Sequence, residues 1–334
     1  MQKFERVRAE LGDVLPTSMD VGRRSVAVLL PCYNEEATVA DTVRGFAEAL
    51  PGARIYVYDN NSSDRTVERA EAAGAIVRRE PLQGKGNVVR RMFSDIDADI
   101  YVMADGDLTY DPTAASALIE RLVRDNLDMV VATRKSSEEE AYRRGHRLGN
   151  RLFNKIVGRL FGRGFTDIFS GYRVMSHRFA KSFPAESAGF EIETELSVHA
   201  LDMRIATAEI AVPYGTRPPE SMSKLRTYRD GARILWTIAM MFRALKPFRF
   251  FGAIAACLAL ASLALGIPVV EDYLQTGLVK RFPTAILAMG VMQLAFLSLV
   301  CGIVVEAVSE GRREHKRLRY LELSSVVARR ALAS

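Results

Sequence analysis

Short apolar runs alternate with segments of helical periodicity along roughly the first 240 residues. The apolar runs predict buried strands at 25–30, 54–58, 75–77, 99–103 and 128–132. The segments between them predict helices at 37–50, 65–73 and 112–124, and another that starts at the glycines near 85 and ends near 95. Strands that alternate with helices favour an α/β domain with a mostly parallel sheet and right-handed crossovers.

Two longer runs, 250–270 and 283–305, contain no charged residue. Each reaches the roughly 20 residues that a helix needs to cross a bilayer core. A helical hairpin buried in a globular core is the alternative, but charge-free runs of this length favour two transmembrane helices. Basic residues flank the pair: Lys246 and Arg249 precede it and the segment 312–319 follows it. The positive-inside rule therefore predicts a multi-pass membrane protein with both termini in the cytoplasm.

The pattern divides the chain into five parts. We expect an N-terminal extension (1–24), a soluble α/β domain (25–224), a juxtamembrane segment (225–249), the transmembrane hairpin (250–307) and a basic cytoplasmic tail (308–334). Residues 224–246 mix basic and apolar side chains at near-helical spacing. This segment is either an amphipathic helix on the membrane surface or an ordinary helix that faces a core.

Composition narrows the class of partner. The chain has 334 residues and a net charge of +6, which suits nucleic acid, a membrane surface or an anionic substrate. Basic and aromatic residues are not interleaved and no zinc pattern occurs, so nucleic acid is not expected. Cys32, Cys257 and Cys301 lack metal-ligand or redox spacing, and the polar segment 1–24 lacks the apolar core of a signal peptide. Both features favour the reducing cytosolic side for the soluble domain.

Polar residues follow three of the predicted strands: 34–36, 59–61 and 105–107. The carboxyl ends of parallel strands lie at one edge of a sheet, where α/β proteins bind ligands. Asp105 and Asp107 are one residue apart, and two such carboxylates can share Mg²⁺ or Mn²⁺. Alone, the pair is also typical of a solvated turn. The convergence of three polar segments favours a site.

These motifs resemble the nucleotide-sugar-binding half of family 2 glycosyltransferases with the GT-A fold, over about residues 25–224. Pro31-Cys-Tyr-Asn-Glu-Glu36 is similar to the opening loop of that family, Asp59-Asn-Asn-Ser-Ser-Asp-Arg-Thr66 to its nucleotide-contacting turn, and Asp105-Gly-Asp107 to its metal motif. Asp167-Ile-Phe-Ser-Gly-Tyr-Arg173 and Ser223-Lys224 are similar to dolichyl- and polyprenyl-phosphate sugar synthases, whose bacterial members also have paired C-terminal spans. Leu108 departs from relatives that continue the acidic run.

The resemblance implies inverting transfer of a sugar from a nucleotide-diphosphate sugar to polyprenyl (undecaprenyl) phosphate, with UDP favoured over GDP. It implies Asp105 and Asp107 as ligands of Mg²⁺ or Mn²⁺, and catalytic roles for Asp107, Asp167 and Arg134. The residues expected to bind the donor are Pro31, Tyr33, Asn34, Glu35, Asp59, Asn61, Lys85, Asp105 and Gly106.

An acceptor phosphate has a second pKa near ~6 and is already a nucleophile at pH 7, so no strong base is required. Bringing it to a diphosphate does require cations, and arginine suits phosphate recognition. The expected acceptor contacts are Arg143, Arg144, Arg173, Arg217, Ser223 and Lys224.

Several interpretations stay open at this point. A processive polysaccharide synthase shares the early motifs, but its Gln-x-x-Arg-Trp element is absent because the single tryptophan, Trp236, follows Leu235. A membrane scaffold without activity is disfavoured by the intact carboxylates. Glu191, Glu193 and Glu195 form the polar face of a strand or a helix start, and Glu193 is also a candidate contact to sugar or acceptor. Small residues in the first span, Gly252, Ala255, Ala256 and Ala259, suit packing in a homo-oligomer.

Overall fold

The computed structural model describes residues 24–135, 165–189, 191–215 and 245–328, together with 236, 239–240 and 242–243. Five predicted acceptor contacts lie outside the described residues: Arg143, Arg144, Arg217, Ser223 and Lys224. Most of the segment 224–246 lies outside them as well. The chain forms two compact units. One comprises Met1–Arg226 with Leu318–Ser334, and the other comprises Thr227–Arg317.

The first unit is built on a seven-stranded sheet with the order β3-β2-β1-β4-β6-β5-β7. Its strands are β1 (Val26–Cys32), β2 (Arg54–Asp59), β3 (Ile76–Arg79), β4 (Ile100–Met103), β5 (Met129–Lys135), β6 (Arg173–Ser176) and β7 (Thr207–Pro213). All neighbours are parallel except β6, which is antiparallel to both β4 and β5. The structure confirms the predicted mostly parallel sheet and the first five strands.

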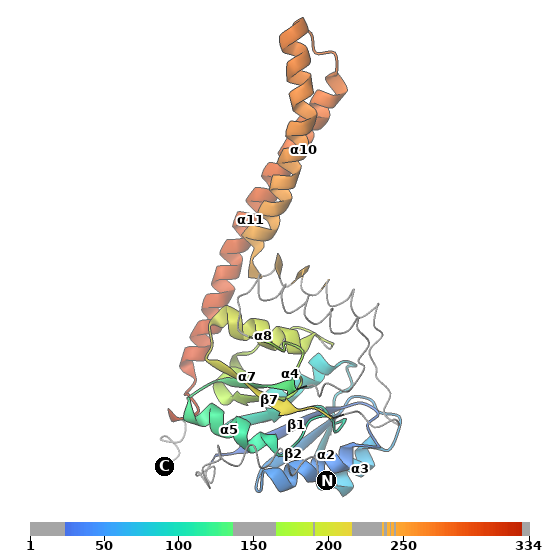
Figure 1. Cartoon of the computed structure of the whole chain (residues 1–334), viewed down its shortest axis with the longest axis vertical. Helices are drawn as coiled ribbons and strands as arrows, with labels where there is room; N and C mark the ends of the chain where they lie inside the picture. The colour runs from blue at the N-terminus through green and yellow to red at the C-terminus, as the bar shows by residue number, and fades with distance from the viewer. Residues whose placement is uncertain are drawn as a thin grey trace. The chain divides into compact units, whose positions relative to one another are not determined.

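Helices cover both faces of this sheet (Figure 1). They are α2 (Val39–Ala49), α3 (Thr66–Ala72), α4 (Lys85–Asp95), α5 (Ala114–Arg124), α7 (His177–Ser182) and α8 (Ile192–Met203). Residues of α2, α3 and α5 join one buried apolar cluster, and residues of α4, α7 and α8 join the other. Apolar side chains alternate between the two along β1, since Val28 belongs to the first cluster and Leu29 to the second. A sheet buried on both faces explains the continuous apolar runs in its strands.

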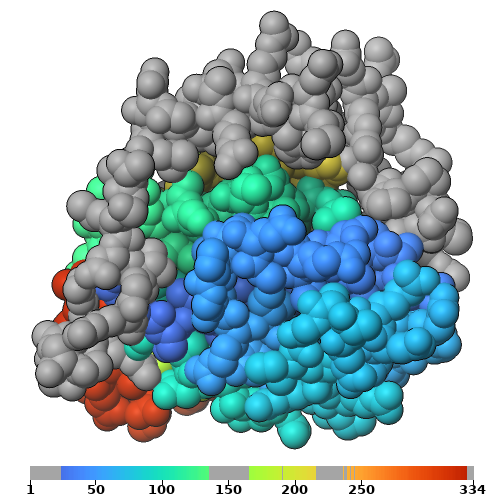
Figure 2. Space-filling view, turned by 90° about the horizontal axis from the view of Figure 1, so that it is seen from below, coloured from blue at the N-terminus to red at the C-terminus, as the bar shows by residue number. Residues whose placement is uncertain are grey.

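The end of the chain returns to this unit after the apolar hairpin. Val326 is buried in the cluster under α2 and α5, and Tyr320 packs against the opposite cluster. The Tyr320 hydroxyl donates to Asp128 at 2.6 Å, and the Arg178 guanidinium lies over the Tyr320 ring at 4.6 Å from its centroid. Figure 2 views the unit from below, with this C-terminal segment in red. Residues 318–328 are therefore part of the folded α/β unit rather than a separate tail.

The second unit contains two long apolar helices, α10 (Pro247–Thr276) and α11 (Phe282–Glu322), whose last turn from Leu318 belongs to the first unit. Their most apolar windows have mean hydropathies of 2.4 and 2.2, and only 11% and 17% of those windows are buried. By length and composition both could cross a membrane. A core helix would bury its apolar residues, whereas these expose Leu260, Ile267 and Phe296.

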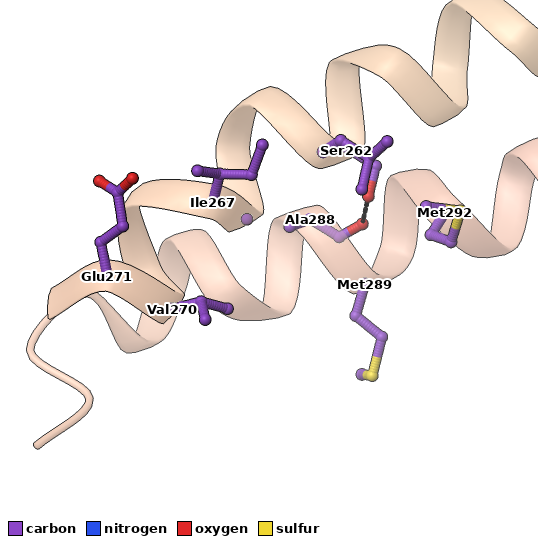
Figure 3. A pocket seen from close by; sticks show the side chains of 9 residues that line it. Ser262, Ile267, Val270, Glu271, Ala288, Met289 and Met292 are labelled. Atoms are coloured by element: carbon purple, nitrogen blue, oxygen red, sulfur yellow. Dashed lines mark hydrogen bonds between the residues drawn. The ribbon is translucent and has the colours of Figure 1, made fainter. Parts of the chain in front are cut away.

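The two helices contact each other through small residues at a seven-residue spacing. The buried positions are Ala255, Ser262 and Val269 on α10, and Ala288, Ala295 and Gly302 on α11. The Ser262 hydroxyl donates to the Ala288 carbonyl at 2.7 Å, beside an open apolar pocket that Met289 and Met292 also line (Figure 3). Small residues at such positions allow close backbone approach. Ala255, one of the residues expected between subunits, thus packs within this hairpin.

Candidate functional site

The structure brings the three predicted polar segments together at one edge of the sheet. β1 lies between β2 and β4, with Cys32 paired to Asp59 and Leu29 paired to Met103. The three strands are parallel, so the segments that follow them leave the sheet at the same edge. The Asn60 amide donates to the Cys32 carbonyl at 2.9 Å, which extends the β1–β2 contact past the strand ends.

Side-chain hydrogen bonds join the first two loops. The Asn34 amide oxygen accepts from the Ser63 N–H at 2.8 Å, and the Ser62 hydroxyl accepts from the Asn34 N–H at 2.9 Å. The Asp64 carboxylate accepts from the Glu36 N–H at 3.1 Å. Asn34 has a φ of 51°, a left-handed conformation that asparagine tolerates better than most residues. The loops expected to bind the nucleotide therefore hold each other in place.

The remaining donor candidates of these loops occupy different environments. Asp59 and Glu35 are buried, and the Asp59 carboxylate accepts from the Ser62 N–H at 3.2 Å. Pro31 is half-buried within β1, whereas Tyr33 is exposed. Asn61 donates to the Pro81 carbonyl at 2.9 Å, which links this loop to the segment before α4. Tyr33, Glu35 and Asn61 lie in the two joined loops, and Pro31 and Asp59 lie at the ends of the strands that lead into them.

The two carboxylates that follow β4 differ from each other. The Asp105 side chain is 31% exposed, whereas Asp107 is buried and accepts from the Thr109 N–H at 3.1 Å and the Thr109 hydroxyl at 2.6 Å. The residue between them is a glycine, Gly106, and a Cβ at this position would lie only 2.5 Å from the Cys32 sulfur. Leu108 has a φ of 57°, an uncommon conformation for a side chain of this size, and is 37% exposed. Backbone strain thus occurs beside the predicted metal pair.

The described residues contain no group of three or more His, Cys, Asp or Glu side chains that could hold a metal ion. A cation bound here would therefore have only Asp105 and Asp107 as ligands from His, Cys, Asp and Glu side chains of the described residues. Mg²⁺ is often bound by one or two carboxylates together with substrate phosphates and water. The pair fits a cation of this kind, in which a diphosphate completes the coordination.

The segment Gly84-Lys85-Gly86 packs tightly against Ser187 and Ala188, just before α8. A Cβ on Gly86 would lie 2.0 Å from the Ser187 carbonyl oxygen, and one on Gly84 would lie 2.2 Å from that of Ala188. The Gly86 N–H donates to the Ala188 carbonyl at 3.0 Å. The Gly84 N–H donates to the Asn60 side chain at 2.7 Å. The two glycines therefore allow a close approach of backbones, and both N–H groups are bonded within the protein.

This approach places Lys85 between two carboxylates. Its ammonium donates to Asp105 and to Glu193, at 2.5 Å in the second case. The Lys85 side chain is 9% exposed and Glu193 is buried. Burial alone would lower the pKa of Lys85, but Asp105 and Glu193 outweigh it and hold the pKa above its usual value. Lys85 therefore stays charged at neutral pH.

Arg134 and Asp167, predicted in separate catalytic roles, bind each other. The Arg134 guanidinium donates to the two Asp167 carboxylate oxygens at 2.7 and 2.8 Å, a planar two-point pair. The guanidinium also lies over the Tyr214 ring at 5.5 Å from its centroid. The two side chains keep 27% and 15% of their surface exposed. The Arg134–Asp167 ion pair therefore lies at the end of β5, at the same edge of the sheet as Asp105.

Arg173 differs from the expectation that it contacts the acceptor phosphate. It is fully buried, and its guanidinium donates to the carbonyls of Ser170, Ile168 and Glu193, each at 2.9 Å. A fourth bond reaches the Ser197 hydroxyl at 2.9 Å. Burial lowers the pKa of Arg173 to about 10. An enclosed guanidinium with these partners ties β6 to α8 and does not reach an external phosphate.

Sequence reasoning missed one further residue of this edge, Tyr110, and left the role of Glu193 open. The Tyr110 hydroxyl accepts from the Gly171 N–H at 3.0 Å and lies 3.4 Å from the Ser170 hydroxyl. Glu193, one of three glutamates at period two, was a candidate contact to sugar or acceptor, and in the structure its carboxylate accepts from Lys85. The contacts of Tyr110 and Glu193 join segments at least sixty residues apart along the chain, so no local signal could have identified these partners.

Comparison with known proteins agrees with this geometry. The profile described as glycosyl transferase family 2 matches residues 27–183. Glycosyltransferase AglJ of Haloferax volcanii is 31% identical over 301 residues, which cover 89% of this chain and 98% of AglJ. Protein RfbJ of Shigella flexneri is 53% identical over 122 residues, 36% of this chain and 95% of RfbJ. Dolichol-phosphate mannosyltransferase of Pyrococcus furiosus is 30% identical over 116 residues, a third (33%) of each chain.

A solved structure shares the fold. Glucosyl-3-phosphoglycerate synthase from Mycobacterium tuberculosis, in complex with Mn²⁺, UDP and phosphoglyceric acid, superposes with a TM-score of 0.55. Its sequence identity is 23%, and the match covers 66% of this chain and 78% of that one. Another structure of the same enzyme holds Mg²⁺ and UDP and superposes with a TM-score of 0.56 at 22% identity, over 68% of this chain and 83% of that one. At this identity the likeness concerns the fold alone.

Proposed function

Because the chain belongs to glycosyl transferase family 2, we propose that it transfers a sugar, with inversion, from a nucleotide-diphosphate sugar to a polyprenyl phosphate. UDP is the favoured nucleotide and undecaprenyl phosphate the favoured acceptor. The proposed location is the cytoplasmic face of the inner membrane. One observation carries the proposal: the same chain combines Asp105 and Asp107 after a strand end with two apolar helices, of whose most apolar windows only 11% and 17% are buried.

The donor half rests on the joined loops. Asp59 and Asn61 lie at the carboxyl end of β2, and Asp105 and Asp107 follow β4, which is parallel to β2 and separated from it by β1. The structural neighbours hold UDP with Mn²⁺ or Mg²⁺. In this chain Asp105 and Asp107 would hold such a cation. The cation, when bound, offsets the negative charge that develops on the departing diphosphate.

The acceptor half rests on chemistry and on the hairpin. A phosphate monoester is largely dianionic at pH 7, so its oxygen attacks without a strong base in the protein. The relatives include a dolichol-phosphate mannosyltransferase, whose acceptor is a lipid phosphate by name. Arg143, Arg144, Arg217, Ser223 and Lys224 remain the proposed contacts to this phosphate. Arg134, held by Asp167, is a described cation at the same sheet edge, and we propose that it orients the approaching anions.

The two apolar helices support a lipid acceptor over a soluble one. The structural neighbour acts on phosphoglycerate by name, which is also a phosphate-bearing molecule. The apolar helices α10 and α11 would be superfluous for a water-soluble acceptor. Their exposed leucine, isoleucine and phenylalanine side chains instead suit hydrocarbon.

A transfer assay tests the proposal directly. The full chain in nanodiscs is incubated with a panel of UDP- and GDP-sugars and undecaprenyl phosphate, with Mn²⁺, with Mg²⁺ or with EDTA. Mass spectrometry is expected to detect a lipid-linked monosaccharide with a UDP-sugar, and NMR to show inversion at the anomeric carbon. The absence of lipid-linked product with every donor would overturn the acceptor proposal. Full activity in EDTA would overturn the metal proposal.

A parallel reaction with 3-phosphoglycerate separates the two classes of phosphate acceptor. Transfer to phosphoglycerate without transfer to the lipid would replace the lipid proposal by a soluble one. Polymer formation from a single donor would instead indicate a processive synthase.

A further inference from the structure

Lys85, Asp105 and Glu193 carry one positive and two negative formal charges, which leaves a surplus of −1. The two carboxylates differ in their freedom. Glu193 is buried in the first turn of α8, and its backbone carbonyl accepts from the fully buried Arg173 at 2.9 Å. Asp105 is 31% exposed and follows β4 at the site edge. One carboxylate is therefore fixed inside the protein, and the other faces the site.

Asp105 is also a predicted cation ligand, and a carboxylate oxygen that binds an ammonium competes with a divalent ion for the same lone pairs. The surplus charge of the three residues and the charge of Asp107 sum to −2, which matches one divalent cation. Lys85 thus lies where a cation approaching Asp105 has to displace it or share Asp105 with it.

We propose that Glu193 is a positioning residue that retains Lys85 in the site while Asp105 exchanges Lys85 for the divalent cation that arrives with the donor diphosphate. This inference rests on the proposed function. After the exchange, an N–H group of Lys85 is free to donate to a diphosphate oxygen. The bond to Glu193 keeps the Lys85 ammonium in the site after its bond to Asp105 is lost. Arg173 acts in turn by fixing the backbone from which Glu193 extends.

The proposal predicts opposite effects of two substitutions on cation affinity. In Glu193→Gln the ammonium loses one of its two ionised partners, so Lys85 binds Asp105 more strongly. The dissociation constant for Mn²⁺ is expected to rise by about threefold to tenfold, as for the loss of one charged hydrogen bond. In Lys85→Met the competitor is removed, and the constant is expected to fall by about tenfold for one unit charge removed next to the ligand. The same Lys85→Met change is expected to weaken UDP binding.

Mn²⁺ alone, without nucleotide, is the probe. Electron paramagnetic resonance measures free Mn²⁺ over the purified full chain in nanodiscs, and calorimetry measures UDP binding in the presence of saturating Mn²⁺. Glu191→Gln is the matched control, since it removes the same charge two residues away, and no hydrogen bond or ion pair joins Glu191 to Lys85 among the described residues. It is expected to leave the Mn²⁺ constant within about twofold.

Shifts in the same direction for Glu193→Gln and Lys85→Met, or no shift in either, would overturn the inference. If circular dichroism shows that Glu193→Gln does not fold, Lys85→Met alone decides: tighter Mn²⁺ binding supports the exchange, and unchanged or weaker binding contradicts it. The result is distinguishable from failure of the proposed function. Opposite shifts together with no lipid-linked product would retain the exchange at a nucleotide site and remove only the lipid acceptor.

Discussion

Two charged clusters lie at opposite edges of the same sheet. At the edge where β5 begins, the fully buried Asp128 accepts from Arg178 at 2.5 and 2.7 Å and from the Ser176 hydroxyl at 2.7 Å. The Tyr320 hydroxyl adds a bond at 2.6 Å. One carboxylate and one guanidinium balance here. At the edge where β4 ends, Lys85 faces both Asp105 and Glu193, and the negative charge is in excess.

We expect this difference to separate a cluster that stabilises the fold from one that binds a ligand. A buried ion pair is tolerated when each charge is matched and hydrogen-bonded, as Asp128 is. Two carboxylates that share one ammonium, as Asp105 and Glu193 share Lys85, leave one negative charge that a bound cation can balance. The balanced cluster therefore stabilises the unit, and the unbalanced one is expected to bind a cation. Substitutions at the two edges should separate activity from stability.

The largest expected effect concerns activity at the unbalanced edge. Asp107→Asn keeps the size of the side chain but removes the charge, and sugar transfer is expected to fall by about 10²–10³-fold, as for other groups that stabilise developing charge. Measurement of kcat/KM in nanodiscs, with circular dichroism for the fold, tests this. Asp41→Asn is the control, because Asp41 is exposed on α2. Undiminished transfer by Asp107→Asn would remove Asp107 from the catalytic set.

The next effect concerns stability at the balanced edge. Asp128→Asn leaves Arg178 without its ionised partner, and the free energy of unfolding is expected to fall by about 3 kcal/mol. Chemical denaturation of the full chain measures the change. Transfer per folded molecule should persist, because Asp128 lies at the sheet edge away from Asp105. A loss of transfer without a loss of stability would contradict this separation.

A smaller effect is expected from Tyr320→Phe, which removes the hydroxyl bonded to Asp128 and keeps the ring beneath Arg178. The expected loss is about 1 kcal/mol, the typical net value of one hydrogen bond. Hydrogen exchange should increase in residues 318–328 and remain unchanged in β1. Tyr273→Phe serves as a control because Tyr273 is half exposed on α10. Equal exchange in both variants would argue against the hydroxyl as an anchor.

The smallest effect concerns the pH dependence of the joined loops. Burial alone would raise the pKa of Asp64, but hydrogen bonds from Thr66 and from the Glu36 N–H outweigh it and lower the pKa below its usual 3.8. A depressed pKa contributes stability that is present above the unfolded value and is lost as pH falls through the folded value. Asp64→Asn should therefore flatten the stability profile below about pH 4 relative to the parent chain. An unchanged slope in that window would show that Asp64 does not link the loops.

The fold and the convergence of polar strand ends were predictable from the sequence, because both follow from local patterns. Apolar runs gave five strands in their observed places, and the residues that follow β1, β2 and β4 had to meet once those strands were parallel and adjacent. The antiparallel β6 was not predicted, since Arg173–Ser176 is short and begins with a charged residue.

The roles of individual charges were less accessible, because they depend on distant partners. Arg173 has the composition of a phosphate ligand, yet three backbone carbonyls enclose its guanidinium. Arg134 and Asp167 are 33 residues apart and bind each other. The boundary expected at residue 307 lies inside α11, which continues to Glu322. Helical periodicity also does not reveal that Val326 reaches a core formed by residues between Val26 and Val212.

The return of Leu318–Ser334 to the unit formed by Met1–Arg226 has a topological consequence. A single folded body cannot lie on two sides of a bilayer, so the polypeptide between Arg226 and Leu318 must cross it an even number of times. The described part of that segment offers two helices able to cross, which permits two crossings or none. Because Val326 is part of the core of the first unit, the number of membrane crossings has to be even, whatever charges flank the hairpin.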